Sequence, residues 1–264
     1  MDIYSILFYF YIYAFVGWCT EVAFAGFKEK RFVNRGFLNG PLCPIYGVGV
    51  TAVVMMAKPF EHNLVVLYIV SAVVVTAIEL VTGFVMDKLF HHKWWDYSGK
   101  PFNIGGYVCL PFSLIWGVAC VFIVKVIHPL FIKLVNLIPY TLGLVLLILF
   151  TLSLLADVVV TYIEVLKLNK QLDALEKVAE ELHQFSNRIG YNIFEKVTDT
   201  LELQEKIANI TDEQKENAQK LLNTYKENMK TGHIRNRLVK AFPTMKPGIH
   251  KEAFESLKRR LRKD

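Results

Sequence analysis

Long stretches without a charged residue dominate the first 162 residues of this 264-residue chain. Between Asp2 and Glu21 there are 18 consecutive uncharged residues, and a helix needs about 20 apolar residues to cross a bilayer. Similar runs predict further spanning helices over about 63–86, 107–127 and 135–156. In lipid the backbone polar groups must be paired within the chain, so helices are the expected structure for these runs. The sequence therefore predicts an all-α, polytopic membrane helix bundle.

A fifth apolar stretch, residues 36–57, opens with glycines and prolines. Proline is tolerated in the first turn of a helix but not in its interior, so we expect a short helix that begins near Pro44. The total is then about five transmembrane helices.

Charge divides the chain in two. Residues 163–264 hold 20 of the 30 Lys and Arg and 16 of the 24 Asp and Glu. We therefore expect a transmembrane domain over 1–162 and a basic helical tail over 163–264. Leucines recur every seven residues at Leu168, Leu175 and Leu182, followed by Ile189. This pattern predicts that the last span continues into the tail, either to pack on the tail's later helices or to form a coiled coil.

The distribution of Lys and Arg orients the bundle. Basic residues gather in the connections after the first and third predicted helices and in the tail, whereas the other two connections hold only Lys58, Lys125 and Lys133. By the positive-inside rule, the N-terminus is expected outside a cell membrane and the tail in the cytoplasm.

The basic tail also suggests partners. The final amphipathic stretch, 249–261, is expected either to lie on anionic lipid or to pack on the tail. No nucleic-acid-binding module is recognisable. A separate ATPase, a regulatory subunit or a second copy of the chain are the protein partners we consider.

Three carboxylates fall within predicted spans. Glu21, Glu79 and Asp157 each lie near the expected cytoplasmic end of a helix, at the level of Arg35 and Asp96. Charges inside a membrane are costly and usually functional, and helix N-termini at this level attract anions. We expect a polar site here for an anionic or zwitterionic solute or lipid. The alternative is structural, with the carboxylates paired to Arg35 or to lysines.

Other chemistry finds little support. His91, His92 and Asp96 are poorly spaced for a metal, and we expect no metal and no cofactor. No Gly-x-Ser-x-Gly, His-Glu-x-x-His or P-loop motif occurs, which argues against an ATPase, hydrolase or metalloprotease. Trp94, Trp95 and Tyr97 are typical of an aromatic belt at the membrane interface.

Two segments resemble each other. In each, a helix with a late glutamate (Glu21, Glu79) is followed by a Gly/Pro-containing loop and a Cys-Pro or Cys-Leu-Pro helix start. This predicts a repeat of two helical hairpins, a pattern found in some transporters, although two similar loops also arise by chance.

Several motifs together resemble a known family. They are Gly17-Trp18-x-x-Glu21, the run from Arg35 to Gly47, Glu79-x-x-Thr82-Gly83, and the run from Trp95 to Asn103. They are similar to a bacterial membrane family known as "putative ABC-transporter permease, type IV", over about residues 5–160. The tail sequence Lys240-Ala241-Phe242-Pro243 also resembles family members. The resemblance implies a multi-spanning plasma-membrane protein and adds Asn103 to the candidate ligand-binding residues.

Three functions fit these observations. The first is a non-ATPase membrane component of a transporter. The second is a scaffold or sensor that recruits a partner through its tail. The third is an intramembrane enzyme that modifies lipid head groups, with Glu21, Glu79 or Asp96 as acid or base.

Overall fold

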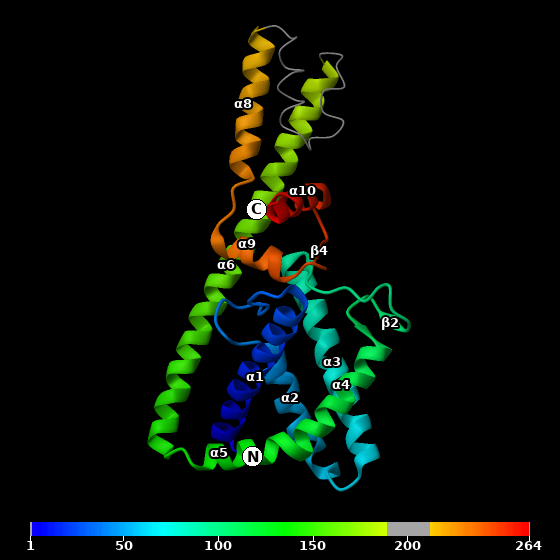
Figure 1. Cartoon of the computed structure of the whole chain (residues 1–264), viewed down its shortest axis with the longest axis vertical. Coiled ribbons are helices and arrows are strands. Elements are labelled where there is room, and N and C mark those ends of the chain that lie inside the picture. The colour runs from blue at the N-terminus through cyan, green and yellow to red at the C-terminus, as the bar shows by residue number, and fades with distance from the viewer. Residues whose placement is uncertain (1, 189–211, 264) are drawn as a thin grey trace. The chain divides into compact units, whose positions relative to one another are not determined.

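The computed structural model describes residues 2–188 and 212–263 (Figure 1). Its α-helices are α1 (Ile3–Glu29), α2 (Pro44–Ala57), α3 (Leu64–Phe90), α4 (Leu110–Phe122), α5 (His128–Asn136), α6 (Tyr140–Arg188), α8 (Asp212–Asn228), α9 (His233–Ala241) and α10 (Lys251–Lys263). A 3₁₀ turn, η1 (Lys58–Phe60), follows α2, and a π-helical turn, η2 (Ile123–Ile127), joins α4 to α5. Two short antiparallel pairs join β1 (His92–Lys93) to β4 (Lys246–Pro247) and β2 (Asn103–Ile104) to β3 (Val108–Cys109). The predicted all-α class is confirmed.

Four helical stretches are long and apolar enough to cross a membrane: Ile3–Glu29, Leu64–Phe90, Leu110–Asn136 and Tyr140–Phe185. A fifth, Pro44–Phe60, is apolar but shorter. It begins at Pro44 as predicted, because in the first turn the missing N–H of proline breaks no helical hydrogen bond.

The predicted boundaries of the last two spans are wrong. The sequence placed a gap between 127 and 135, but α4, η2 and α5 form one helical stretch over Leu110–Asn136, which contains Lys125 and Lys133. The chain breaks instead at Pro139, and α6 begins at the next residue. Proline lacks an N–H and its ring clashes with the preceding turn, so a new helix starts after it.

The described residues group into two compact units. The first combines Met1–Glu164 with Arg237–Gly248, and the second lies within Val165–Asn236 and Ile249–Asp264. The division at residue 162 between membrane domain and tail stays a prediction.

Within the first unit, α1 packs on α2, α2 on α3, and α3 on α4. Aromatic side chains of α1 fill the core, and the Tyr13 hydroxyl lies 2.9 Å from the His128 Nδ1 of α5. Most apolar side chains on α3, α4 and the first half of α6 face outward; Val73, Val118 and Leu152 are each about 60% exposed (63%, 62% and 60%). An apolar surface of this kind suits lipid rather than water.

The two hairpins, α1–α2 and α3–α4, share local features. The residue after the first helix of each hairpin, Lys30 or His91, is left-handed. A cysteine, Cys43 or Cys109, precedes the second helix. At Gly17 the close approach of α2 leaves no room for a side chain, since a Cβ there would lie 2.4 Å from the Cβ of Tyr46.

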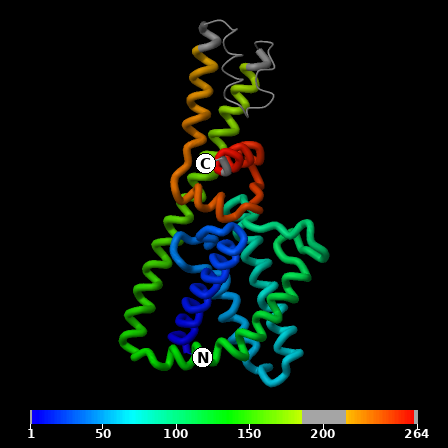
Figure 2. The backbone as a smooth tube through the Cα atoms, viewed as in Figure 1, coloured from blue at the N-terminus to red at the C-terminus, as the bar shows by residue number. Residues whose placement is uncertain are grey.

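The loops that join the helices of each hairpin lie at one end of the first unit, which we call the loop end. The first loop covers residues 30–43 and the second covers 91–109. We name residues 237–248 the return segment. This segment contacts both loops, and its backbone can be followed in Figure 2. Strand β4 of this segment pairs with β1 of the second loop, and the Gly248 N–H donates to the His91 carbonyl at 2.7 Å.

The second unit is built from the end of α6, α8, α10 and the segments beside them. Leu168, Leu172, Leu175 and Leu182 of α6 are fully buried, so the predicted heptad face forms its core, while Ile189 lies outside the described residues. The Gln171 amide donates to the Asn228 carbonyl at 2.6 Å. The α6 stripe therefore packs on the tail's own later helices.

The apolar face of α10 is also buried in the second unit. Ala253 and Leu261 are 6% exposed, and Phe254 and Leu257 are 0% exposed. Of the two expectations for this stretch, packing on the tail is the one that the structure supports, because a buried face is not available to lipid.

Candidate functional site

Glu21 is held on α1 by groups from the first loop and from α2. The Tyr46 hydroxyl donates to its Oε1 at 2.6 Å, and an Arg35 terminal nitrogen (Nη1) lies 3.6 Å from its Oε2. Arg35 also stacks over the Phe24 ring at 5.5 Å, and its Nε is buried without a hydrogen-bond partner. Arg35 therefore neutralises Glu21 while part of its donor capacity stays unused.

Glu79 is held on α3 by the second loop. The Tyr97 hydroxyl donates to its Oε1 at 3.3 Å, and its Oε2 is buried without a hydrogen-bond partner. Tyr97 is itself fixed, because its ring stacks on Phe112 at 4.9 Å and its N–H donates to the Gly106 carbonyl at 2.8 Å. Burial raises the pKa of the Tyr97 phenol and its hydrogen bond to Glu79 raises it further, so this group stays a donor.

Tyr97 connects the surroundings of the two carboxylates. Tyr97 interacts electrostatically with Glu21 as well as with Glu79, and also with Tyr46. We name Glu21, Arg35, Tyr46, Glu79 and Tyr97 the carboxylate cluster. It lies at the first turns of α2 and α4, whose positive helix ends favour negative charge.

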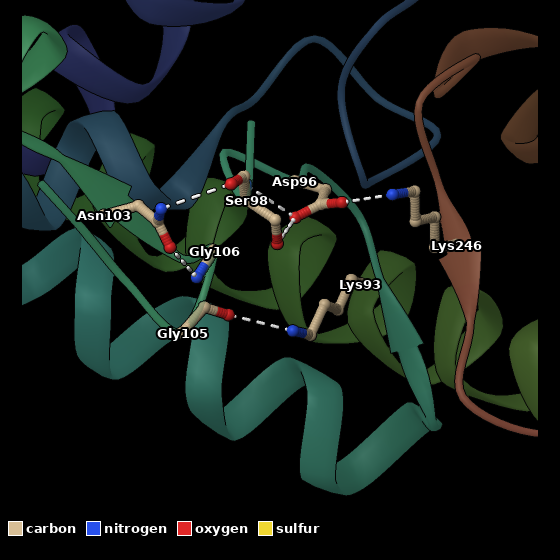
Figure 3. A network of polar contacts seen from close by, with 7 residues as sticks. All are labelled: Lys93, Asp96, Ser98, Asn103, Gly105, Gly106 and Lys246. Atoms are coloured by element: carbon tan, nitrogen blue, oxygen red, sulfur yellow. Dashed lines mark hydrogen bonds and ion pairs between the residues drawn. The ribbon is translucent and has the colours of Figure 1, made fainter. Parts of the chain in front are cut away.

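Asp96 lies in a different network, on the second loop (Figure 3). Its Oδ2 pairs with Lys246 of the return segment at 2.5 Å, and its Oδ1 accepts from the Ser98 N–H and hydroxyl. Burial acts to raise the pKa of Asp96, but the hydrogen bonds from Lys246 and Ser98 outweigh it and lower the pKa to about 2. Both Asp96 oxygens are thus engaged away from the carboxylate cluster.

Asn103 closes the same loop. Its amide donates to the Lys100 carbonyl at 2.9 Å. It also donates to the Ser98 carbonyl at 3.3 Å, and its Oδ1 accepts from the Gly106 N–H at 3.2 Å (Figure 3). Nearby, Lys93 Nζ donates to the Gly105 carbonyl. All polar atoms of the Asn103 side chain serve the loop, which is a positioning role.

Asp157 of α6 fastens the first loop. Its Oδ1 accepts from the Asn39 N–H and side-chain amide at 3.0 and 2.9 Å, and its Oδ2 accepts from the Gly40 N–H at 2.7 Å. Thr161, one turn later, also donates to Oδ1 at 3.2 Å. This carboxylate binds the main chain that leads into α2, and so it fixes where α2 begins.

The return segment adds a guanidinium to the first loop. Arg237 donates to the carbonyls of Gly36 at 2.7 Å, Phe37 at 3.1 Å and, more weakly, Asn34 at 3.4 Å. Burial lowers the pKa of Arg237, and the charge of Asp157 opposes this effect. An arginine fork suits this role because one planar group bridges several acceptors.

Trp94 does not lie in an aromatic belt at the membrane interface. It is 2% exposed and packs edge-on against Phe37 of the first loop at 4.9 Å and Phe242 of the return segment at 5.0 Å. The interpretation from sequence was wrong for this residue, because aromatic clusters at an interface and in a core have the same composition.

In residues 2–188 and 212–263 no three His, Cys, Asp or Glu side chains come together as metal ligands. His92 is 0% exposed and packs at 6.4 Å from the Trp94 ring centroid.

A family model described as "putative ABC-transporter type IV" matches residues 8–162. The chain belongs to this family. It is thus a transporter-like membrane protein, as the motifs around Glu21, Arg35, Glu79 and Trp95 suggested. Searches of curated proteins and of solved structures find no match.

The family match spans all six predicted site residues, whereas the return segment lies beyond it. Sequence reasoning missed Tyr46 and Tyr97 as partners of the carboxylates, although both stand inside the quoted family motifs. It also missed Arg237 and Lys246. The sequence features that could have drawn attention to them were the nearby Lys240-Ala241-Phe242-Pro243 motif and the excess of basic residues in the tail.

Proposed function

We propose that this chain is a non-ATPase membrane component of a transporter, and that its carboxylate cluster binds a zwitterionic solute or lipid head group. One observation carries the proposal. Two buried polar atoms of opposite character in the cluster, Arg35 Nε and Glu79 Oε2, both lack a hydrogen-bond partner. Buried polar groups are normally paired, so such atoms point to a ligand that supplies the missing partners.

A zwitterion fits these two atoms better than a plain anion. An anionic group of the ligand would accept from Arg35, and a cationic group would donate to Glu79. A purely anionic ligand would face two carboxylates and one guanidinium. Glu21, already bound by Tyr46 and Arg35, keeps Arg35 in place.

The remaining candidates have other roles in this proposal. Asp157 and Asn103 position the two loops, and Asp96 joins the second loop to the return segment. We further propose that the loop end faces the cytoplasm, since the basic connections lie there. A separate ATPase subunit that binds at this end would supply the energy of transport.

Native mass spectrometry of gently purified protein tests the proposal, because it reports bound small molecules and partner subunits together. We expect a co-purified polar solute or lipid that is lost in Glu79→Gln and in Arg35→Gln. Removal of one charge-assisted hydrogen bond weakens binding by about 1.5–3 kcal/mol, or roughly 10- to 150-fold. The matched control is Glu61→Gln, an exposed carboxyl in the α2–α3 connection.

Retention of the same molecule by both cluster variants would refute the binding site. Purified protein without any bound molecule, but with a soluble partner that depends on the tail, would favour the scaffold function instead. Chemical conversion of an added phospholipid would favour the enzyme.

A further inference from the structure

The two carboxylates of the cluster have unequal surroundings. Glu21 has a cation, Arg35, at 3.6 Å and a short hydrogen bond from Tyr46. Glu79 has one hydrogen bond, from Tyr97, and a second oxygen that is buried and receives none. Within the described residues no Lys, Arg or His pairs with Glu79.

Among the described residues, the other elements packed against α3 bring no charged side chain to Glu79, since Lys93 of β1 is bound to the Gly105 carbonyl. The loop contributes the Tyr97 phenol, β3 contributes the Cys109 thiol, and α2 contributes Tyr46. Glu21, with which Tyr97 also interacts, is paired with Arg35. A negative charge on Glu79 would therefore have no cation of its own among the described residues.

Because Glu79 Oε2 is buried, the lack of a cation beside it decides its protonation state. An ionised carboxylate that leaves water without a cation loses far more hydration energy than a neutral carboxyl group does. A neutral carboxyl leaves at most one O–H without an acceptor, which is the smaller cost. Of two carboxyls of which only one is paired with a cation, the unpaired and buried carboxyl is the one that keeps its proton.

We propose that Glu79 is a proton-binding site, neutral in the resting protein, whereas Glu21 is paired with Arg35. The proton resides on Oε2, and Oε1 accepts from Tyr97. This proton site extends the proposed function, and any role of Glu79 in transport rests on that function. If the solute binds in this cluster, protonation of Glu79 and solute binding are linked. In chemical terms, a cationic group that reaches Oε2 replaces the proton. The O–H bond breaks, its electron pair stays on the oxygen, and the proton passes to water.

Infrared spectroscopy of the purified protein tests the assignment without any solute. A protonated carboxylic acid has a carbonyl stretching band that carboxylates and amides lack, and this band shifts in deuterated water. We expect the band in the unmodified protein at pH 7. It should vanish in Glu79→Gln and persist in Glu21→Gln, which is the matched control because it removes the neighbouring carboxyl.

A third variant locates the group. Tyr97→Phe removes the hydrogen bond to Oε1, so the band should persist but shift in frequency, while Tyr107→Phe should leave it in place. This readout does not require Glu79 to be replaced, so it stands even if Glu79→Gln fails to fold.

The assignment is overturned if the unmodified protein lacks the band at pH 7, if Glu79→Gln keeps it, or if Tyr97→Phe leaves its frequency unchanged. These results are separate from those of the mass spectrometry. A protein that binds no solute but shows the band would refute the proposed function and leave the proton site intact. A solute that binds to the cluster, together with no band in the solute-free protein, would do the opposite.

Discussion

Arg237 joins the return segment to the first loop, and its replacement gives a direct test of the loop end. Arg237→Ala removes two firm hydrogen bonds, to the carbonyls of Gly36 and Phe37, and one weak bond to Asn34. Hydrogen bonds from a charged donor are each worth about 1.5–3 kcal/mol. The two firm bonds together then stabilise the fold by about 3–6 kcal/mol.

Desolvation reduces this figure. Burial lowers the pKa of Arg237, which shows that the folded state disfavours its charge, and the alanine variant no longer bears this cost. We therefore expect a net loss near the lower limit, about 3 kcal/mol. For a chain of 150–250 residues, each kcal/mol shifts Tm by about 2–4 °C, so Tm should fall by about 6–12 °C.

Two measurements separate a local effect from a general one. Thermal unfolding in a mild detergent gives the shift in Tm. Hydrogen exchange followed by mass spectrometry should show faster exchange in the first loop, where the Asn39 and Gly40 N–H groups are bonded to Asp157. Lys240→Ala is the matched control, since it removes one positive charge from an exposed position of the same helix.

Arg237→Lys sharpens the test. A lysine ammonium lacks the planar fork that bridges two carbonyls, so we expect it to recover less than half of the lost stability. If Arg237→Ala and Lys240→Ala agree within about 0.5 kcal/mol, the ordinary effect of a surface substitution, then these hydrogen bonds do not hold the loop.

Two further predictions concern pH and topology. The pKa of Asp96 is lowered from 3.8 to about 2, so its pair with Lys246 contributes stability above about pH 4 that is lost as the pH falls through about 2. Lys246→Met should therefore cost at most about 1 kcal/mol at neutral pH, because the lysine is 68% exposed, and progressively less as the pH falls through about 2; a difference independent of pH contradicts the assignment. For topology, the four native cysteines (Cys19, Cys43, Cys109 and Cys120) are first replaced by alanine. Single cysteines then introduced at His62 and Lys100 should react oppositely with an impermeant reagent in whole cells, the first labelled and the second protected. Labelling at Lys100 in intact cells would reverse the proposed orientation.

Apolar runs and proline positions were enough to predict much of the fold. The start of α2 at Pro44 and the continuation of α6 along the leucine stripe follow from local rules, and the structure confirms both. The break at Pro139 was missed, because Lys125 and Lys133 were interpreted as residues of a connection. Hydropathy locates apolar surface, but it does not distinguish a helix that carries two lysines from a loop.

The contacts of the candidate site were predictable only where the two residues are close in sequence or lie at the same end of their helices. Glu21 and Arg35 are 14 positions apart, and their pairing was one of the stated alternatives. Asp96 and Lys246 are 150 positions apart. The excess of basic residues in the tail was interpreted as a surface for anionic lipid, and nothing in the pattern distinguishes one lysine that binds a loop carboxylate from the others.

The return segment links the two hairpins through their loops. Arg237 binds the first loop, Lys246 and β4 bind the second, and the Trp94 ring lies between Phe37 of the first loop and Phe242. The first loop leads into α2, which carries Tyr46, and the second carries Tyr97, so both donors to the carboxylate cluster depend on loops that this segment holds. A displacement of the segment would change the positions of both donors together. The family match ends at residue 162, but residues 237–248 hold both loops to which these donors are connected.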